Sequence, residues 1–206
     1  MAAVLPTKGN LMAAKRSRAL AQTGFELMDR KRNILVREMM SLLEDAGQIQ
    51  AQIDTVFAEA YTSQMKANIK LGICDRIAEA VEVDDSLEIQ YRSVMGVEIP
   101  HIPDRTPPMR LEYGFYSSDS SLDECYLNFR KVKDLTRRLA EIENSIYRLA
   151  NAVKKTQKRA NALKNIVIPG FDHTIRVITE ALEEKEREEF VRLKVIKQTT
   201  GNSSES

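Results

Sequence analysis

Apolar residues recur along the first third of the chain at alternating steps of four and three. A sustained alternation of this kind keeps one narrow apolar stripe facing a partner helix and is typical of a left-handed coiled coil. It predicts a helix from about Asn10 to Ala60, with residues 62–80 continuing it or forming a short separate helix. Only two arginines interrupt the series, which comprises Ala14, Arg18, Ala21, Phe25, Met28, Arg32, Leu35, Met39, Leu42, Ala46, Ile49, Ile53, Val56 and Ala60.

A second series with the same spacing starts at Leu135 and predicts another long helix. Thr7 or Asn10 is placed to cap the first helix, and Ser120 or Ser121 the second. The oxygen of a short polar side chain accepts a hydrogen bond from a free N–H group of the first turn. Pro169 with Gly170 predicts a kink or short break, after which helix resumes to about Lys197. The second series comprises Leu135, Leu139, Ile142, Ile146, Leu149, Val153, Thr156, Ala160, Leu163 and Val167.

The middle of the chain changes to a period of two. Leu87, Ile89 and Tyr91 alternate with polar residues, as do Val97 and Ile99, and the alternation returns over residues 109–115. This period indicates strands. The proline-rich stretch PHIPDRTPP forms a rigid connection between them. Residues 84–117 are therefore expected to form a β-hairpin or a small β-rich lobe.

Two long helices on either side of a lobe can pair antiparallel within one chain or parallel in a dimer. The first 32 residues carry excess positive charge and residues 180–189 excess negative charge, so antiparallel pairing sets opposite charges side by side. Two helices of an ordinary bundle are the alternative, but such helices rarely keep a heptad for so many turns. The expected seam comprises Met28, Leu35, Met39, Leu42, Ile49, Ile53, Leu139, Ile142, Ile146, Leu149, Val153 and Leu163.

The predicted fold is mainly α: a long antiparallel two-helix coiled coil, made by the N- and C-terminal segments, with a small central β-hairpin lobe. The segments are residues 1–80, 81–120 and 121–206, with a kink near Pro169. Composition agrees, since 30% of the 206 residues are charged and only 6% aromatic, which suits long solvated helices. A net charge of +1 does not indicate a globally basic nucleic-acid binder. No apolar run approaches the ~20 residues that span a bilayer, so we expect a cytoplasmic chain that inserts no segment into a membrane.

Candidate chemistry is sparse. The stretch TKGN lacks the Gly-x-x-x-x-Gly-Lys-Ser/Thr spacing and the preceding strand of a phosphate loop. His101 is read as a solvated residue of the proline-rich connection, and His173 as a helix-surface residue. Cys74 and Cys125 are read as ordinary thiols in a reducing compartment. Adjacent glutamates on one helix point in different directions and form no acid–base dyad. We expect no catalytic residue, no metal site and no cofactor.

Three stretches in order along the chain resemble the D subunit of the V-type and archaeal-type (A-type) rotary ATPases. They are PTKGNLMAAKRSRALAQTGFELMDRKRNIL, SVMGVEIPHI and IPGFDHTIRVITEALEEKEREEFVRLKVIKQ. The likeness covers nearly the whole chain, although RSRALAQTGFELMDRKRN is less Leu-rich than the family pattern. The resemblance implies a central-stalk rotor shaft that hydrolyses nothing itself and transmits torque between the ATP-hydrolysing or -synthesising hexamer and the membrane ring that moves hydrogen or sodium ions.

The resemblance also implies partners. The paired terminal helices would enter the hexamer of catalytic A and non-catalytic B subunits. The middle lobe would bind the small rotor F subunit and reach the funnel-shaped C/d subunit on the ring. The chain would be monomeric within this membrane-peripheral complex and would bind no nucleic acid. The hexamer-facing residues would be Thr7, Asn10, Lys15, Arg18, Lys31, Arg32, Glu183, Glu184, Arg187, Arg192, Lys194 and Lys197. The alternative from another class is a self-associating coiled-coil scaffold or a nucleic-acid-binding helical protein.

Overall fold

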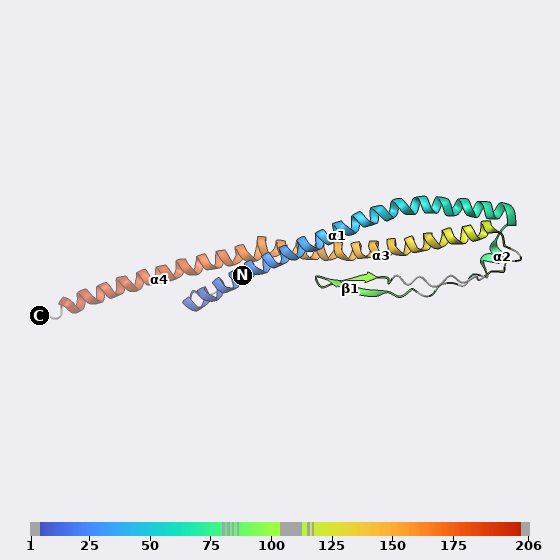
Figure 1. Cartoon of the computed structure of the whole chain (residues 1–206). Coiled ribbons are helices and arrows are strands. Elements are labelled where there is room, and N and C mark those ends of the chain that lie inside the picture. Colours follow the sequence, from blue (N-terminus) through green and yellow to red (C-terminus); the bar gives the residue numbers. More distant parts are fainter. Residues whose placement is uncertain are drawn as a thin grey trace. The chain divides into compact units, whose positions relative to one another are not determined.

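The described chain is dominated by helices that run along the two ends of the sequence (Figure 1). A computed structural model describes residues 5–202, except Ala80, Glu82, Asp84, Ser86, residues 104–112, Phe115 and Ser117. For residues 198–202 it describes the backbone alone. The order is α1, α2, β1, β2, α3, η2 and α4. The prediction of a mainly α chain with a small two-stranded hairpin is confirmed.

The first helix, α1, runs without interruption from Lys8 to Leu71. Thr7 caps it, since the Asn10 amide N–H donates to Thr7 Oγ1 at 3.2 Å. The helix ends at Gly72, whose φ of +78° is a conformation open to glycine and whose N–H donates to the Asn68 carbonyl at 3.0 Å. A single turn, α2 (Asp75–Ala78), follows. Residues 62–71 thus continue the first helix.

The C-terminal half contains α3 (Ser120–Ala162), the π-helical segment η2 (Leu163–Val167) and α4 (Ile168–Asn202). The prediction that Ser120 or Ser121 precedes α3 as its cap is wrong, because both lie inside the helix. The residue before the helix is Asp119. Its carbonyl accepts the Leu122 N–H at 2.8 Å, and its carboxylate accepts the Ser121 hydroxyl at 3.0 Å.

The interruption near Pro169 is a π-helical turn placed just before the proline. The Ile168 N–H donates to the Leu163 carbonyl five residues back, instead of four. Proline lacks an N–H, and in a regular α-helix its ring would clash with the carbonyl four residues earlier. One wider turn before Pro169 relieves that conflict, so the chain stays helical through the proline.

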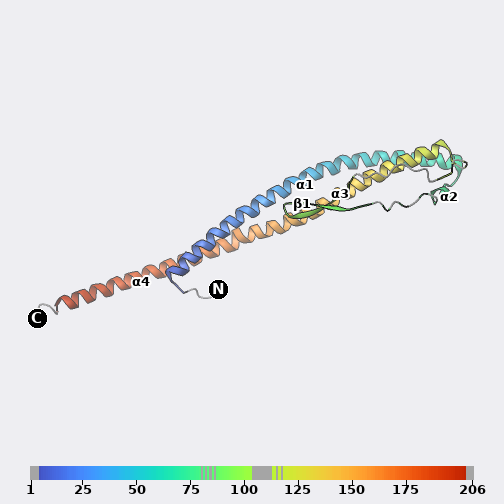
Figure 2. The ribbon, with the colours of Figure 1, turned by 60° about the horizontal axis from the view of Figure 1, so that its bottom comes forward.

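The chain divides into two compact units, Met1–Arg32 with Lys155–Ser206, and Asn33–Lys154. In each unit α1 packs antiparallel against a C-terminal helix (Figures 1 and 2). In the first unit Lys8 pairs with Glu186 and Arg18 with Asp172. In the second, Lys70 near the C-terminal end of α1 pairs with Asp119, the residue before α3. The predicted antiparallel pairing is confirmed, whereas the three-segment division at residues 80 and 120 stays a prediction.

The expected seam residues lie at least half-buried. Leu35, Ile53 and Leu149 are buried, and the other nine are intermediate in exposure. Towards the end of α1 the buried positions become small, with Ala60, Ser63 and Ala67. Hydroxyls in the interface are satisfied locally, since Ser63 donates to the Ala60 carbonyl and Ser145 to the Glu141 carbonyl. Such internal bonds allow a polar group to be buried without a large energetic penalty.

The β-hairpin pairs β1 (Gln90–Val94) with β2 (Val97–His101), antiparallel, with Val94 opposite Val97. Met95 and Gly96 form the two-residue turn, with φ of +50° and +76°, the signs that a type I′ turn requires. Pro100 faces Tyr91 in the sheet. Hydrogen-bonded and open pairs alternate outward from the turn, so this pair does not need the N–H that proline lacks.

The hairpin is therefore shorter and earlier than the sequence predicted. Leu87 and Ile89 precede β1 and belong to no strand, and Pro100 and His101 belong to β2 instead of a rigid connection. Tyr113 and Gly114 lie in no strand either. Residues 109–112 and Phe115 of the expected later strand lie outside the described residues. The two-residue turn at Met95–Gly96 pairs its flanking strands directly. The hairpin therefore closes there, and the proline-rich stretch is not the connection between its strands.

One buried cluster joins the hairpin to both helices of the second unit. Leu35 of α1, Ile99 of β2 and Leu149 of α3 are each 0% exposed. Met39, Leu42, Val94, Val97, Ala152 and Val153 pack around them. Three elements distant in sequence thus share one core, and burial of these side chains supplies much of the force that holds the hairpin on the helices.

Replacing Ile99 with alanine is expected to lower the free energy of unfolding by about 2–5 kcal/mol, because the cavity would open where three elements meet. Urea unfolding of the full chain would measure the change. Ile89→Ala is the matched control, since Ile89 is 53% exposed and should change stability by less than about 0.5 kcal/mol. Equal losses in both variants would contradict a shared core at Ile99.

Candidate partner-binding surfaces

The two polar residues expected to face a partner at the start of α1 are used to build the helix terminus. Thr7 accepts the Asn10 amide N–H, and the Asn10 side-chain amide donates to the Leu5 carbonyl at 2.7 Å. These bonds satisfy groups that the first turn of a helix leaves open. Thr7 and Asn10 therefore define how the chain enters α1.

Two ion pairs join α1 to α4 in the first unit. Lys8 Nζ lies 3.0 Å from Glu186 Oε1, and Arg18 Nε lies 2.9 Å from Asp172 Oδ1. The hydrogen bond and the charge of Glu186 raise the pKa of Lys8. Both pairs are solvent-exposed, so each contributes little to stability, but together they favour the antiparallel register. Arg18, expected to face a partner, is thus engaged within the chain.

Other charged residues of the expected set pair along their own helices. Arg32 lies 2.7 Å from Asp29 and donates to Gln157 Oε1 at 3.5 Å, so it also bridges to α3. Arg187 lies within 3.7 Å of both Glu183 and Glu184. Pairs three or four residues apart on a helix surface stabilise it by a few tenths of a kcal/mol. On α4, such pairs set positive and negative side chains next to one another.

The remaining members of the set divide into two places. Lys15 is exposed, and Lys31 is half-buried, both on α1. Arg192, Lys194 and Lys197 lie on the part of α4 that continues past the first residue of α1 (Figures 1 and 2). Arg192 pairs with Glu188 at 3.8 Å. Thr7 and Asn10 thus lie next to Lys8, which pairs with Glu186, but the structure does not bring the whole set together.

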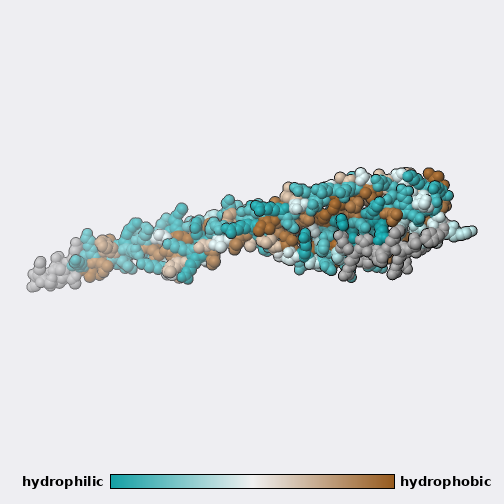
Figure 3. Space-filling model, in the orientation of Figure 1, coloured by the Kyte–Doolittle hydropathy of each residue, from teal (hydrophilic) through white to brown (hydrophobic). Residues whose placement is uncertain are grey.

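The same end of α4 exposes large apolar side chains that the charge-based prediction overlooked. Their exposed fractions are 70% for Phe190, 58% for Val191 and 65% for Leu193. Figure 3 shows brown, hydrophobic areas among the teal surface along this part of the molecule. The signal was present in the sequence as FVRLKVI, which follows a run of charged residues. Gathered apolar side chains on a surface are typical of a protein-binding site.

A second apolar surface lies in the other unit, near the end of α1. Tyr61, Met65 and Ile69 are exposed at spacings of four, so they share one face of the helix. Tyr61 also stacks with Phe57 at 6.0 Å between ring centroids and meets Phe129 of α3 edge to face at 5.9 Å. The aromatic contacts fix the position of this face relative to α3.

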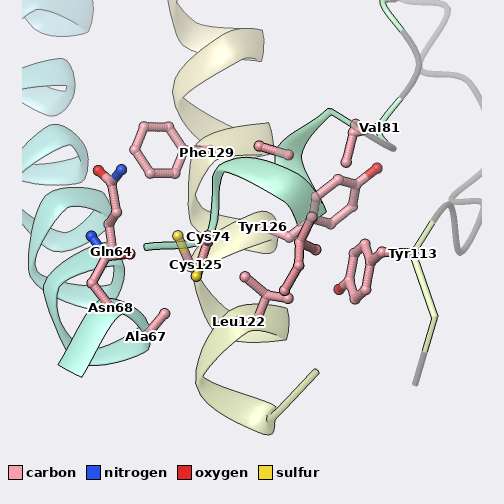
Figure 4. A pocket seen from close by; sticks show the side chains of 12 residues that line it. Gln64, Ala67, Asn68, Cys74, Val81, Tyr113, Leu122, Cys125, Tyr126 and Phe129 are labelled. Atoms are coloured by element: carbon pink, nitrogen blue, oxygen red, sulfur yellow. The ribbon is translucent and has the colours of Figure 1, made fainter. Parts of the chain in front are cut away.

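An apolar pocket of about 210 Å³ opens between the end of α1, α2 and the start of α3 (Figure 4). Ala67, Cys74, Leu122, Cys125 and Tyr126 are among its lining residues. Tyr113 closes one side, and its hydroxyl donates to Asp123 Oδ1 at 2.6 Å. Burial, together with this bond to a carboxylate, raises the pKa of Tyr113 well above its usual range. The phenol therefore stays protonated, and its hydrogen bond to Asp123 holds Tyr113 against α3.

The β-hairpin is fastened to α3 by three side chains that share one helix face, Glu141, Ser145 and Arg148. Glu141 binds His101 Nδ1 at 2.9 Å and accepts the Ile102 N–H at 3.1 Å. Ser145 lies 3.4 Å from the Pro100 carbonyl. Arg148 donates to the Glu98 carbonyl at 3.1 Å. His101 is exposed, as expected, but it is not a loop residue, because it ends β2 and contacts Glu141 of α3.

The described residues hold no group of three His, Cys, Asp or Glu side chains arranged to bind a metal ion. Over the same residues, no helix combines the length and apolarity that crossing a bilayer requires.

Comparison with known proteins agrees with this arrangement. Residues 10–198 match the family model that describes the D subunit of ATP synthase. A V-type ATP synthase D subunit from Thermotoga neapolitana is 44% identical over 197 residues, which is 95% of this chain and 97% of the relative. The A-type ATP synthase D subunits of Thermococcus sibiricus and Pyrococcus horikoshii are 35% and 34% identical, each over 94% of this chain and 93% of the relative.

The fold defines an antiparallel coiled-coil protein with a small two-stranded hairpin. With a family match over almost the full length, the chain belongs to the family of ATP synthase D subunits.

Replacing Glu141 with alanine is expected to loosen the hairpin, because the Ile102 N–H and His101 both lose their partner. Leaving a partly buried donor unsatisfied costs about 1–3 kcal/mol, so backbone exchange over residues 98–102 should accelerate about five-fold or more. Hydrogen–deuterium exchange of the full chain would measure it. Glu143→Ala is the control, since Glu143 is exposed on the same helix. Unchanged exchange in E141A would show that Glu141 is not needed to hold the hairpin on α3.

Proposed function

We propose that this chain is the central-stalk rotor subunit of a V/A-type ATPase. In this role it transmits torque between the catalytic hexamer and the membrane ring that translocates ions. It hydrolyses no ATP itself, binds no cofactor or nucleic acid and inserts no segment into the membrane. The proposal rests on family membership together with one observation, that the two ends of a single chain pair antiparallel through an apolar seam.

A single chain paired with itself suits a shaft for a physical reason. A rotor must turn relative to a ring of surrounding proteins while its own helices keep their register. Cross-helix contacts oppose sliding in each unit: Lys8–Glu186 and Arg18–Asp172 in one, and Leu35 packed with Leu149 in the other. Because interlocked side chains resist displacement, torque applied to one helix is passed to the other.

The end of α4 is the part proposed to lie within the hexamer of A and B subunits. Phe190, Val191 and Leu193 supply apolar area, while Arg192, Lys194 and Lys197 carry positive charge on the same stretch. Exposed charges act weakly and are screened over ~10 Å at 0.1 M salt. Such a surface can touch each catalytic site in turn without being held by any one of them. Lys15 and Lys31 extend the charged surface along α1.

The unit Asn33–Lys154 is proposed to take the other partners of the stalk. Its β-hairpin and the face formed by Tyr61, Met65 and Ile69 are the candidate contacts for the small rotor F subunit and for the funnel-shaped C/d subunit. Both surfaces are anchored, the hairpin by Glu141 and Arg148 and the helix face by the Tyr61–Phe129 contact. An anchored surface loses little entropy on binding, which favours a stable complex.

A self-associating coiled-coil scaffold is the second candidate, and one observation favours it. Leu20 and Leu27 are 73% and 58% exposed and stand seven residues apart on α1. Apolar residues at heptad spacing on an outer face form a seam for another helix. This interpretation predicts a stable assembly of the chain with itself.

Co-elution of the purified chain with a hexamer of A and B subunits separates the two. The shaft predicts one chain per hexamer, with ATP turnover altered on binding, both with and without added F subunit. Mass and ATPase rate would be followed together across the elution. A self-dimer that leaves the hexamer untouched would overturn the shaft and support the scaffold.

Charging the apolar end of α4 is expected to impair coupling without unfolding the chain. In Phe190→Asp with Leu193→Asp, stability should change by less than about 0.5 kcal/mol, since both side chains are exposed. ATP-driven ion transport by the assembled complex should fall several-fold, because two carboxylates would have to be desolvated against the hexamer. Glu189→Gln, on the same exposed turn, is the control and should keep transport. Full transport in the double variant would remove this end from the interface.

A further inference from the structure

Two thiols far apart in sequence line the same wall of the apolar pocket. Cys74 directly precedes α2, and Cys125 lies near the start of α3. Both belong to the pocket lining, and Figure 4 shows their sulfur atoms at the same end of it. Both cysteines are free.

The two thiols differ in access. Cys74 is partly exposed, and its thiol lies 3.4 Å from the Gly72 carbonyl. Cys125 is only 8% exposed, and burial raises the pKa of its thiol, an effect that the Ser63 hydroxyl partly opposes. The thiolate is the reacting species, so a solution oxidant reacts first with the more exposed Cys74 and much more slowly with the buried Cys125.

The non-helical backbone around Cys74 allows the Cys74 sulfur atom to change position. Gly72 and Ile73 lie between α1 and α2 and belong to no helix, and Gly72 has a φ of +78°. A disulfide needs a defined torsion about its sulfur atoms, so one partner must be able to adjust. Cys125 sits within a long helix and stays in place, whereas the short non-helical segment can move Cys74.

We propose that Cys74 and Cys125 form a reversible intramolecular disulfide by exchange with a small-molecule disulfide such as glutathione disulfide. The Cys74 thiolate attacks one sulfur of the oxidant, whose S–S bond breaks and releases one glutathione thiolate. The Cys125 thiolate then attacks Cys74 Sγ, breaks the mixed disulfide and releases the second. The protein loses two electrons and two thiol protons, and the oxidant becomes two glutathione thiols.

This bond would tie the segment between α1 and α2 to α3. In the reduced chain, the described contacts at this end of the unit include the pocket lining and the ion pair between Lys70 of α1 and Asp119, the residue before α3. A covalent link closes a long loop and restricts the opening of this end of the unit. The inference concerns the thiols alone and stands whether or not the chain is a rotor.

The full chain is equilibrated without oxygen in buffers that contain graded ratios of glutathione to glutathione disulfide. The reaction is then quenched with acid. Alkylation and mass spectrometry count free thiols, bound glutathione and linked peptides. We expect complete loss of both thiols in oxidising buffer, a Cys74–Cys125 linked peptide, no retained glutathione, and full reversal on reduction. Chains that stay reduced, keep one or two glutathiones, or form disulfides only between separate chains would overturn the proposal.

Single variants test the order of the two steps. Cys125→Ser should stop at one stable glutathione adduct on Cys74. Cys74→Ser should form an adduct on Cys125 at least about ten-fold more slowly, because the remaining thiol is buried. Equal rates for the two variants would contradict the assigned roles. The wild-type linked peptide decides the disulfide itself even if a variant folds poorly.

Discussion

Burial of a narrow apolar stripe along α1 is the constraint on which the other features of this chain depend. A helix of this length cannot leave such a stripe in water, and the long helices available to cover it are α3 and α4. Antiparallel packing satisfies it, and steps of four and three keep the stripe in the interface along each unit. The seam is not uniform: it is bulky at Leu35 and Leu149 and small at Ala60, Ser63 and Ala67. Small residues let α1 and α3 approach closely near their connected ends.

The β-hairpin is held by packing on this helical pair as well as by its own turn. Isolated two-stranded hairpins are marginal in water, so the burial of Ile99 between Leu35 and Leu149 is what makes this one a fixed part of its unit. Glu141 and Arg148 then set its position along α3 through bonds to backbone and side chain. The hairpin is thus integrated into the core of its unit through Ile99.

Charge has two distinct uses in this chain. Some charged residues join helices, as Lys8 does with Glu186, and others pair along one helix, as Arg187 does with Glu183 and Glu184. Both uses keep the surface hydrated while limiting strong attraction to any single partner. The proposed rotor role requires this balance, since a shaft that was tightly bound in one orientation could not turn. Apolar contact at the end of α4 would then add affinity without a preferred angular position.

Patterns local to the sequence were enough to establish the two long helices, their antiparallel pairing and the family. They were not enough to establish the contacts between elements that are distant in sequence. Periodicity and charge repeat over many turns, the family likeness lies in short stretches such as PTKGNL and SVMGVEIPHI, and the cap at Thr7 needs only neighbouring residues. The turn at Met95–Gly96, the bond between His101 and Glu141, and the pocket shared by Cys74 and Cys125 depended on how the hairpin and α2 pack. Long-range proximity leaves no periodic trace along a chain, because it is set by packing between elements and not by the spacing of residues within them.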